Sequence, residues 1–184
     1  MEAAAINKIV LVLSTALLGS VNAWAQGNES VYTNLDGKQC RTLKSAPSGA
    51  GSYVGQCPGI AGYTLLVEED DVRQNITVVT PRGQKHSLNL WEVISPAFSN
   101  VGQKAEWRVN KAAGKPVPVA LIVRFSASED AANPEKKTSY RGVAKITSRE
   151  ICVTNKILPG AKANEEARRA ADEAANKPCL KNPK

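Results

Sequence analysis

The chain has 184 residues, a formal net charge of +7 and only 5% aromatic residues. Its basic residues are scattered, so the sequence lacks the basic stripe and the stacking platform that nucleic-acid binding requires, and we expect no nucleic-acid partner. A basic surface is attracted to anionic polymers of a cell envelope, although solubility alone is a sufficient reason for the charge.

Residues 1–25 have the pattern of a signal peptide. Lys8 precedes an uncharged segment over 9–21, and Ala23, Trp24 and Ala25 give the small-x-small pattern that signal peptidase cleaves. The apolar segment is shorter than the roughly 20 residues that a membrane helix needs, so we expect no transmembrane segment in the mature chain. The predicted location is periplasmic or secreted.

All four cysteines follow this predicted signal, and an oxidising compartment favours their pairing as two disulfide bonds. Cys40 and Cys57 flank a segment over 45–52 that is rich in Ser, Gly and Ala, which suits a loop that the two thiols close. Cys152 pairs most economically with Cys179, because the intervening chain suits a strand end, a turn and a helix folded back. Each closed loop should stabilise the fold by about 3 kcal/mol.

The sequence after the predicted signal peptide indicates a mostly β fold with one C-terminal α-helix. Residues 26–39 are polar and turn-rich, which predicts a flexible N-terminal arm, and residues 40–184 are expected to form a single disulfide-stapled domain. Runs of β-favouring residues predict an antiparallel sheet or sandwich of about six to seven strands. The predicted strands cover 63–68, 75–80, 86–91, 104–109, 117–125, 140–147 and 151–157.

Alternation of side chains assigns faces to these strands. In 86–91, Leu88 and Leu90 share one face, and in 104–109 the charged residues point outward while Trp107 points toward the core. The strand over 117–125 is the most apolar and is placed centrally, with Pro116 and Pro118 at its start because proline cannot donate to a ladder.

The end of the chain changes to a helical period. Alanines recur with i, i+4, i+7, i+8 and i+11 spacing and predict one apolar stripe on a helix over about 161–176, at positions 163, 167, 170, 171 and 174. A stripe of small residues stabilises an isolated helix little, so docking on the sheet must hold it, with Cys179 as the covalent attachment.

Several motifs resemble a group of uncharacterised exported (periplasmic) proteins of Gram-negative bacteria. The motifs are Gly62-Tyr63 with Val67-Glu68, a Cys-Pro-Gly before that strand, the Asp71-Val72-Arg73 turn, the Glu106-Trp107-Arg108 strand, and the Ala-rich helix over 164–179 that ends in cysteine. The resemblance spans most of the mature chain. It implies a periplasmic setting and the same two cysteine pairs, and it brings no activity with it.

Two charge pairs are the strongest candidates for a binding site. Asp71 with Arg73, and Glu106 with Arg108, have the i, i+2 spacing that puts both members on one strand face. If the strands are neighbours, the pairs form a structural ladder. Alternatively Arg73, Trp107 and Arg108 line a groove suited to a carboxylate or a sugar, although a buried Trp107 is favoured.

Catalytic and metal signatures are weak. The single histidine, His86, has no nucleophile motif beside it, and the sequence predicts no catalytic residue, no cofactor and no metal. The acidic cluster over 68–71 is expected to be a solvated turn, with calcium binding as the alternative.

The sequence therefore predicts a protein that is not an enzyme, a periplasmic binding or inhibitor-like protein that recognises another protein or an anionic envelope polymer. A cell-wall polymer hydrolase using Asp71 or Glu106 is the alternative, and a structural envelope protein is the third. The ligand and the oligomeric state stay open.

Overall fold

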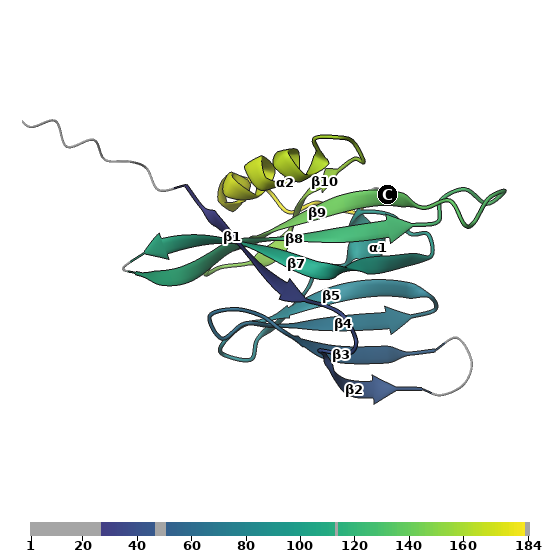
Figure 1. Cartoon of the computed structure of the whole chain (residues 1–184), viewed down its shortest axis with the longest axis horizontal. Helices are drawn as coiled ribbons and strands as arrows, with labels where there is room; N and C mark the ends of the chain where they lie inside the picture. Colours follow the sequence, from purple (N-terminus) through teal and green to yellow (C-terminus); the bar gives the residue numbers. More distant parts are fainter. Residues whose placement is uncertain (1–26, 47–50, 113, 183–184) are drawn as a thin grey trace, which may run out of the picture.

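The computed structural model describes residues 27–46, 51–112 and 114–182, so the predicted signal peptide lies outside the described residues. The described chain is mostly β, with a helix packed at its C-terminal end (Figure 1). The elements are β1 (Glu29–Asn34), β2 (Arg41–Ser45), β3 (Tyr53–Pro58), β4 (Thr64–Asp70), β5 (Arg73–Val79), β6 (Lys85–Ser87), α1 (Leu90–Val93), β7 (Ser99–Ala112), β8 (Lys115–Ala127), β9 (Thr138–Ile146), β10 (Ile151–Ile157), α2 (Ala163–Asp172) and the 3₁₀ turn η1 (Ala174–Asn176).

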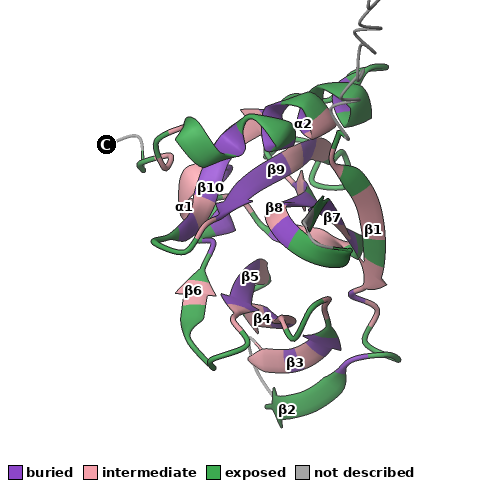
Figure 2. Ribbon diagram, turned by 90° about the vertical axis from the view of Figure 1, so that its left-hand side faces the viewer, coloured by how far each residue is buried: buried purple, intermediate pink, exposed green. Residues whose placement is uncertain are grey.

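The strands form one open mixed sheet in the order β10-β9-β8-β7-β5-β4-β3-β2, with β1 paired to β7 and β6 paired to β5. Neighbouring strands are antiparallel except at a single parallel bridge between Arg73 of β5 and Ser99 of β7. β1 pairs with β7 along the edge that β5 leaves unpaired after this bridge. The two halves of the sheet, β7–β10 and β2–β5, therefore diverge, as Figure 2 shows. The mostly β fold with one C-terminal helix is confirmed.

The main core lies between the two halves. Leu65 and Ile76 from one half belong to the same buried cluster as Trp107 and Phe125 from the other. The ring of Tyr63 lies 6.1 Å from that of Trp107 and adds a tilted aromatic contact. The predicted orientation of Trp107 is confirmed, since its side chain is 0% exposed. β8 lies between β7 and β9, which confirms its predicted central place.

The described sheet has ten strands, more than the six or seven predicted. One addition is β1, so the prediction of a flexible arm over 26–39 is wrong for this segment. Its polar residues have partners: Thr33 accepts a hydrogen bond from the buried indole of Trp107 at 2.9 Å, and Ser30 contacts both Glu106 and Arg108 at 2.6 Å. A polar sequence that looked loose is ordered because its side chains satisfy groups on β7.

The predicted strand over 86–91 is also corrected. β6 ends at Ser87, and after Asn89, which has a left-handed backbone (φ 48°), the chain begins α1 at Leu90. The expected alternation of burial still holds, since Leu88 and Leu90 are buried and Trp91 is exposed. The change of element comes from a tertiary contact, because the Leu90 N–H donates to the side chain of Asn75 on β5 at 3.0 Å.

α2 docks on β8 and β9 by its alanine stripe and on β7 by two charge pairs. Ala167, Ala170 and Ala171 pack on Ile122 and Val143, which confirms the predicted stripe. Arg108 donates to both carboxylate oxygens of Asp172 at 2.8 and 2.9 Å, and Arg168 donates to Glu106 at 2.6 Å. In one pair the strand provides the cation, and in the other it provides the anion. Charges at i and i+2 on the strand therefore match opposite charges at i and i+4 on the helix.

Both predicted disulfides are present. Cys40 is bonded to Cys57 and Cys152 to Cys179, and no described cysteine is free. The first bond links the two ends of the β2–β3 hairpin, and the second ties the segment after α2 to β10. Within the described residues, no helix combines the length and apolarity needed to cross a membrane.

Arg108 and Lys111 provide a matched test of the helix docking. Both are ion-paired residues of β7, but the side chain of Arg108 is buried and that of Lys111 is exposed. Arg108→Met should lower the free energy of unfolding by about 2–4 kcal/mol, because it removes a buried charge partner from Asp172 and Ser30. Lys111→Met should change it by less than about 1 kcal/mol. Urea denaturation measures both, and equal losses would contradict this account.

Candidate functional site

A groove of about 670 Å³ opens on the half of the sheet that contains β3, β4 and β5. We call it the acidic groove. It is lined by Lys44, Ser52, Tyr53, Val54, Glu68, Glu69, Asp70, Asp71, Arg73, Asn75, Trp91 and Pro96. Its volume lies within the range typical of small-molecule sites, about 300–1,000 Å³.

Trp91 supplies the aromatic wall of the groove. Its side chain is 41% exposed, although Leu90 beside it is fully buried. The indole is therefore carried on a helical turn that is itself anchored, both by Leu90 in the core and by the hydrogen bond from the Leu90 N–H to Asn75. An exposed aromatic side chain on an anchored backbone is a common binding element, because its position is fixed before the ligand arrives.

The floor of the groove is a hydrogen-bond network around Glu68. Its carboxylate accepts from the Thr77 hydroxyl at 2.8 Å and from the Asn75 amide at 3.4 Å, and the same amide donates to Ser87 at 2.8 Å. Asn75 and Thr77 are both buried. The network holds the Glu68 side chain in one orientation and connects it to the segment that carries Trp91.

The β4–β5 turn also lines the groove, through Asp70, Asp71 and Arg73. Asp71 and Val72 both have left-handed backbones, with φ of 45° and 59°, the pattern of a type I′ hairpin turn. Val72 is β-branched, for which this conformation is strained. The turn directs Arg73 over the ring of Phe98 at 4.9 Å and pairs it with Asp71, while its Nε donates to the carbonyl of Pro96 at 2.8 Å.

The lining of the acidic groove combines acceptors, a donor and an aromatic face. Four of its lining residues carry carboxylates and two, Lys44 and Arg73, carry positive charge. Carboxylates accept hydrogen bonds, the Lys44 ammonium donates them, and Trp91 offers an apolar face, whereas the amide N–H groups of Asn75 already have partners within the protein. The excess of carboxylates disfavours an anionic ligand and favours a neutral or cationic one.

The four binding residues predicted from sequence do not form one groove. Asp71 and Arg73 line the acidic groove, whereas Trp107 lies in the core and Arg108 is buried under α2. The charge ladder does not form either, because β5 and β7 meet at one register position. The sequence did not predict Trp91 as a site residue. The alternation over 86–91 places its side chain on the outer face, but it does not indicate which residues lie near it.

Glu106, one of the two acids of the hydrolase alternative, lies in a different groove from Asp71, beside α2. Burial would raise the pKa of its carboxyl, but the hydrogen bonds from Arg168 and Ser30 and the charge of Arg168 outweigh burial and lower that pKa. Glu106 is therefore held as a structural anion. His86 lies on β6 and lines neither groove.

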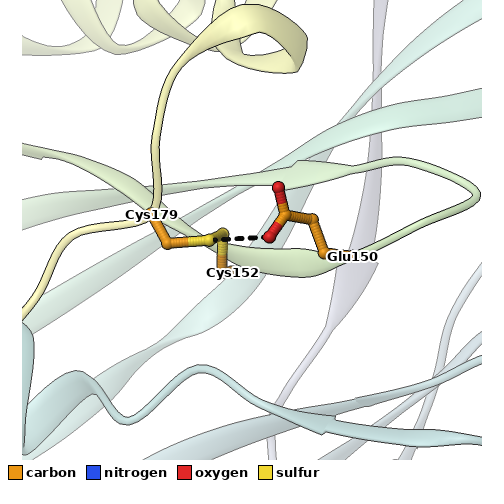
Figure 3. A group of neighbouring side chains, drawn as sticks. All are labelled: Glu150, Cys152 and Cys179. Carbon is orange, nitrogen blue, oxygen red and sulfur yellow. Dashed lines mark hydrogen bonds between the residues drawn. A yellow bond between two sulfur atoms is a disulfide. The ribbon is translucent and has the colours of Figure 1, made fainter.

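Glu150, Cys152 and Cys179 form the one cluster of metal-ligating residue types found among the described residues (Figure 3). Both sulfurs belong to a disulfide, which leaves a single carboxylate as a ligand. That carboxylate is paired at 2.5 Å with Lys145, whose ammonium also donates to the carbonyl of Lys177 at 2.8 Å. The cluster therefore fastens the segment after α2 to the β9–β10 hairpin.

The fold and the groove together define a disulfide-linked β-sheet domain with a polar surface groove. Comparisons of the chain with protein-family models, with curated proteins and with solved structures found no match.

The lowered pKa of Glu106 predicts a pH-dependent contribution to stability. Because the folded state favours the ionised form, this contribution is present above the ordinary pKa of 4.5 and is lost as the pH falls through the folded value. Glu106→Gln should destabilise the protein at about pH 7, and the difference from the parent should shrink below pH 4.5. Urea denaturation across this range measures it, with the exposed Glu165→Gln as control. A pH-independent difference would contradict the assignment.

The strained turn gives a separate prediction. Val72 is 55% exposed, so its side chain contributes little burial. Val72→Gly should raise the free energy of unfolding by about 1 kcal/mol, because glycine adopts a left-handed backbone without the steric cost that valine bears. Thermal and urea denaturation test this, with Val117→Gly, an exposed valine of β8, as a control that should lose stability. Destabilisation by Val72→Gly would show that the turn is not strained.

Proposed function

We propose that the protein is an exported, non-catalytic binding protein whose acidic groove recognises a neutral or amine-bearing sugar of the cell envelope. The observation that carries the proposal is the exposed indole of Trp91 in one groove with four carboxylates and two cationic side chains. The apolar face of a sugar ring packs on an aromatic side chain, and its hydroxyls exchange hydrogen bonds with such polar groups.

Export is supported by three features. Residues 1–25 have a signal-peptide pattern, the motifs resemble exported proteins of Gram-negative bacteria, and the two disulfides are of the kind that persist in an oxidising compartment. We infer a periplasmic or secreted location from them. In that location the accessible saccharides are those of the envelope.

The absence of catalysis is inferred from the positions of the acids. Glycoside hydrolysis needs two carboxylates flanking one bond. Asp71 and Glu106 line separate grooves, and within the acidic groove Glu68, Glu69 and Asp71 each have a donor from the protein. These donors suit carboxylates that accept from a ligand more than carboxylates that transfer protons to it.

The test is calorimetric titration of the mature chain with oligomers of N-acetylglucosamine, of glucosamine and of galacturonate, which are neutral, cationic and anionic. We expect one or both of the first two to bind and the third not to bind. Trp91→Ala should weaken binding by about tenfold or more, since an aromatic contact contributes roughly 1 kcal/mol beyond its buried area. Leu158→Ala, which removes an exposed apolar residue outside the groove, should have no effect.

Other outcomes separate the alternatives. Release of new reducing ends from the oligomers would support the hydrolase. Binding of galacturonate alone, or binding that Trp91→Ala leaves unchanged, would overturn the sugar site. Retention of a periplasmic protein through the acidic groove, with no binding of any oligomer, would favour the inhibitor-like alternative. Cofractionation with isolated cell wall, independent of Trp91, would favour a structural role.

A further inference from the structure

The second groove differs from the acidic groove in the sign of its charge. It has a volume of about 580 Å³ and lies beside the first two turns of α2, over β7, β8 and β9. We call it the basic groove. Its lining is Tyr32, Asn100, Val101, Gly102, Gln103, Lys104, Glu106, Ile122, Arg124, Ser126, Arg141, Asn164, Ala167 and Arg168, which includes four cationic side chains and one carboxylate.

The single carboxylate is already used. Glu106 accepts from Arg168 at 2.6 Å and from Ser30 at 2.6 Å. The side chain of Arg124 has no hydrogen bond or ion pair with any described residue. The Arg141 side chain donates through its Nε to the neutral amide oxygen of Asn164 at 2.8 Å. Two guanidinium groups in one groove therefore lack an anionic partner within the described chain.

The two guanidinium groups are also neighbours. Arg124 on β8 and Arg141 on β9 stand directly opposite each other in the strand register, an arrangement in which like charges destabilise the pair. Burial and the charge of Arg124 lower the pKa of the Arg141 guanidinium. An anion placed between them would remove this repulsion.

Arg108 has the carboxylate partner that Arg124 and Arg141 lack. Arg108 also rises from this face of the sheet, and there α2 provides Asp172 as a bidentate partner. At Arg124 and Arg141 the helix provides only the amide of Asn164. The space is kept open by Gly102, where a Cβ atom would lie 2.8 Å from the Cβ of Arg124.

We propose that Arg124 and Arg141 bind an oxyanion, the phosphate group of a phosphorylated envelope molecule. A phosphate offers more oxygens to the two guanidinium forks than a carboxylate does. Its negative charge, one for a diester and nearly two for a monoester, balances part of the surplus of cations in the groove. The groove is much larger than an inorganic phosphate, which leaves room for the sugar or lipid headgroup that carries it. This site is independent of the acidic groove and of its proposed sugar ligand.

The experiment follows binding by calorimetry and by amide chemical shifts at about 0.15 M salt, where non-specific attraction is screened. The probes are inorganic phosphate, a hexose 6-phosphate, the same hexose without phosphate, and vesicles with and without phosphatidylglycerol. The test variant is Arg124→Gln/Arg141→Gln. The control is Arg82→Gln/Arg149→Gln, which removes the same charge from two exposed positions outside both grooves.

We expect the hexose phosphate or the phosphatidylglycerol vesicles to bind, and the unphosphorylated hexose and the neutral vesicles not to bind. The test variant should lose at least about tenfold in affinity, while the control variant should lose less than about threefold. Hexose phosphate binding indicates a sugar phosphate, and vesicle binding alone a lipid headgroup. The test variant should fold at least as stably as the parent, because it removes adjacent like charges.

Gly102→Ala gives a second test, since its Cβ displaces Arg124 without changing the charge, and it should also weaken binding. Absence of binding to every phosphorylated probe, or equal losses in the test and control variants, would overturn the proposal. Neither result bears on Trp91 or the acidic groove, so this proposal and the proposed function fail separately.

Discussion

The guanidinium of Arg108 is the constraint around which one half of the molecule is organised. Arg108 is 8% exposed as a residue, and an unpaired buried charge would cost several kcal/mol, so its surroundings must supply acceptors. α2 supplies Asp172, and the N-terminal segment supplies the hydroxyl of Ser30 and the carbonyl of Asn28. One buried charge thereby holds both β1 and α2 against β7.

The position of α2 in turn defines the basic groove. The helix covers Ala120, Ile122 and Val143 with its alanine stripe, and its first turn reaches Arg141 through Asn164 but provides no partner for Arg124. The same sheet face is therefore apolar and closed under the helix and cationic and open beyond it. The second disulfide and the Lys145–Glu150 pair hold the segment after α2 in place, so the docking of this short helix does not rest on its own marginal stability alone.

The two grooves divide the charge of the protein between them. The chain is basic overall, yet its densest acidic segment lines one groove beside Trp91, and unpaired arginines line the other. They lie on different halves of the bent sheet, which are joined by one parallel bridge and by the core. If both grooves bind as we propose, the protein suits a polymer or surface that displays both neutral sugars and phosphate groups.

The sequence by itself determined what depends on local pattern or on covalent pairing. Period-2 alternation predicted the central strands and the inward orientation of Trp107. The alanine spacing predicted α2, and the positions of the cysteines predicted both disulfides. Only the tertiary structure decided which polar groups meet. Ser30 and Thr33 looked like parts of a loose arm because their partners lie on β7, and Trp91 looked like a strand residue because Asn75 caps α1 across the sheet. Contacts between residues distant in sequence leave no periodic signal, and both grooves are made of such contacts.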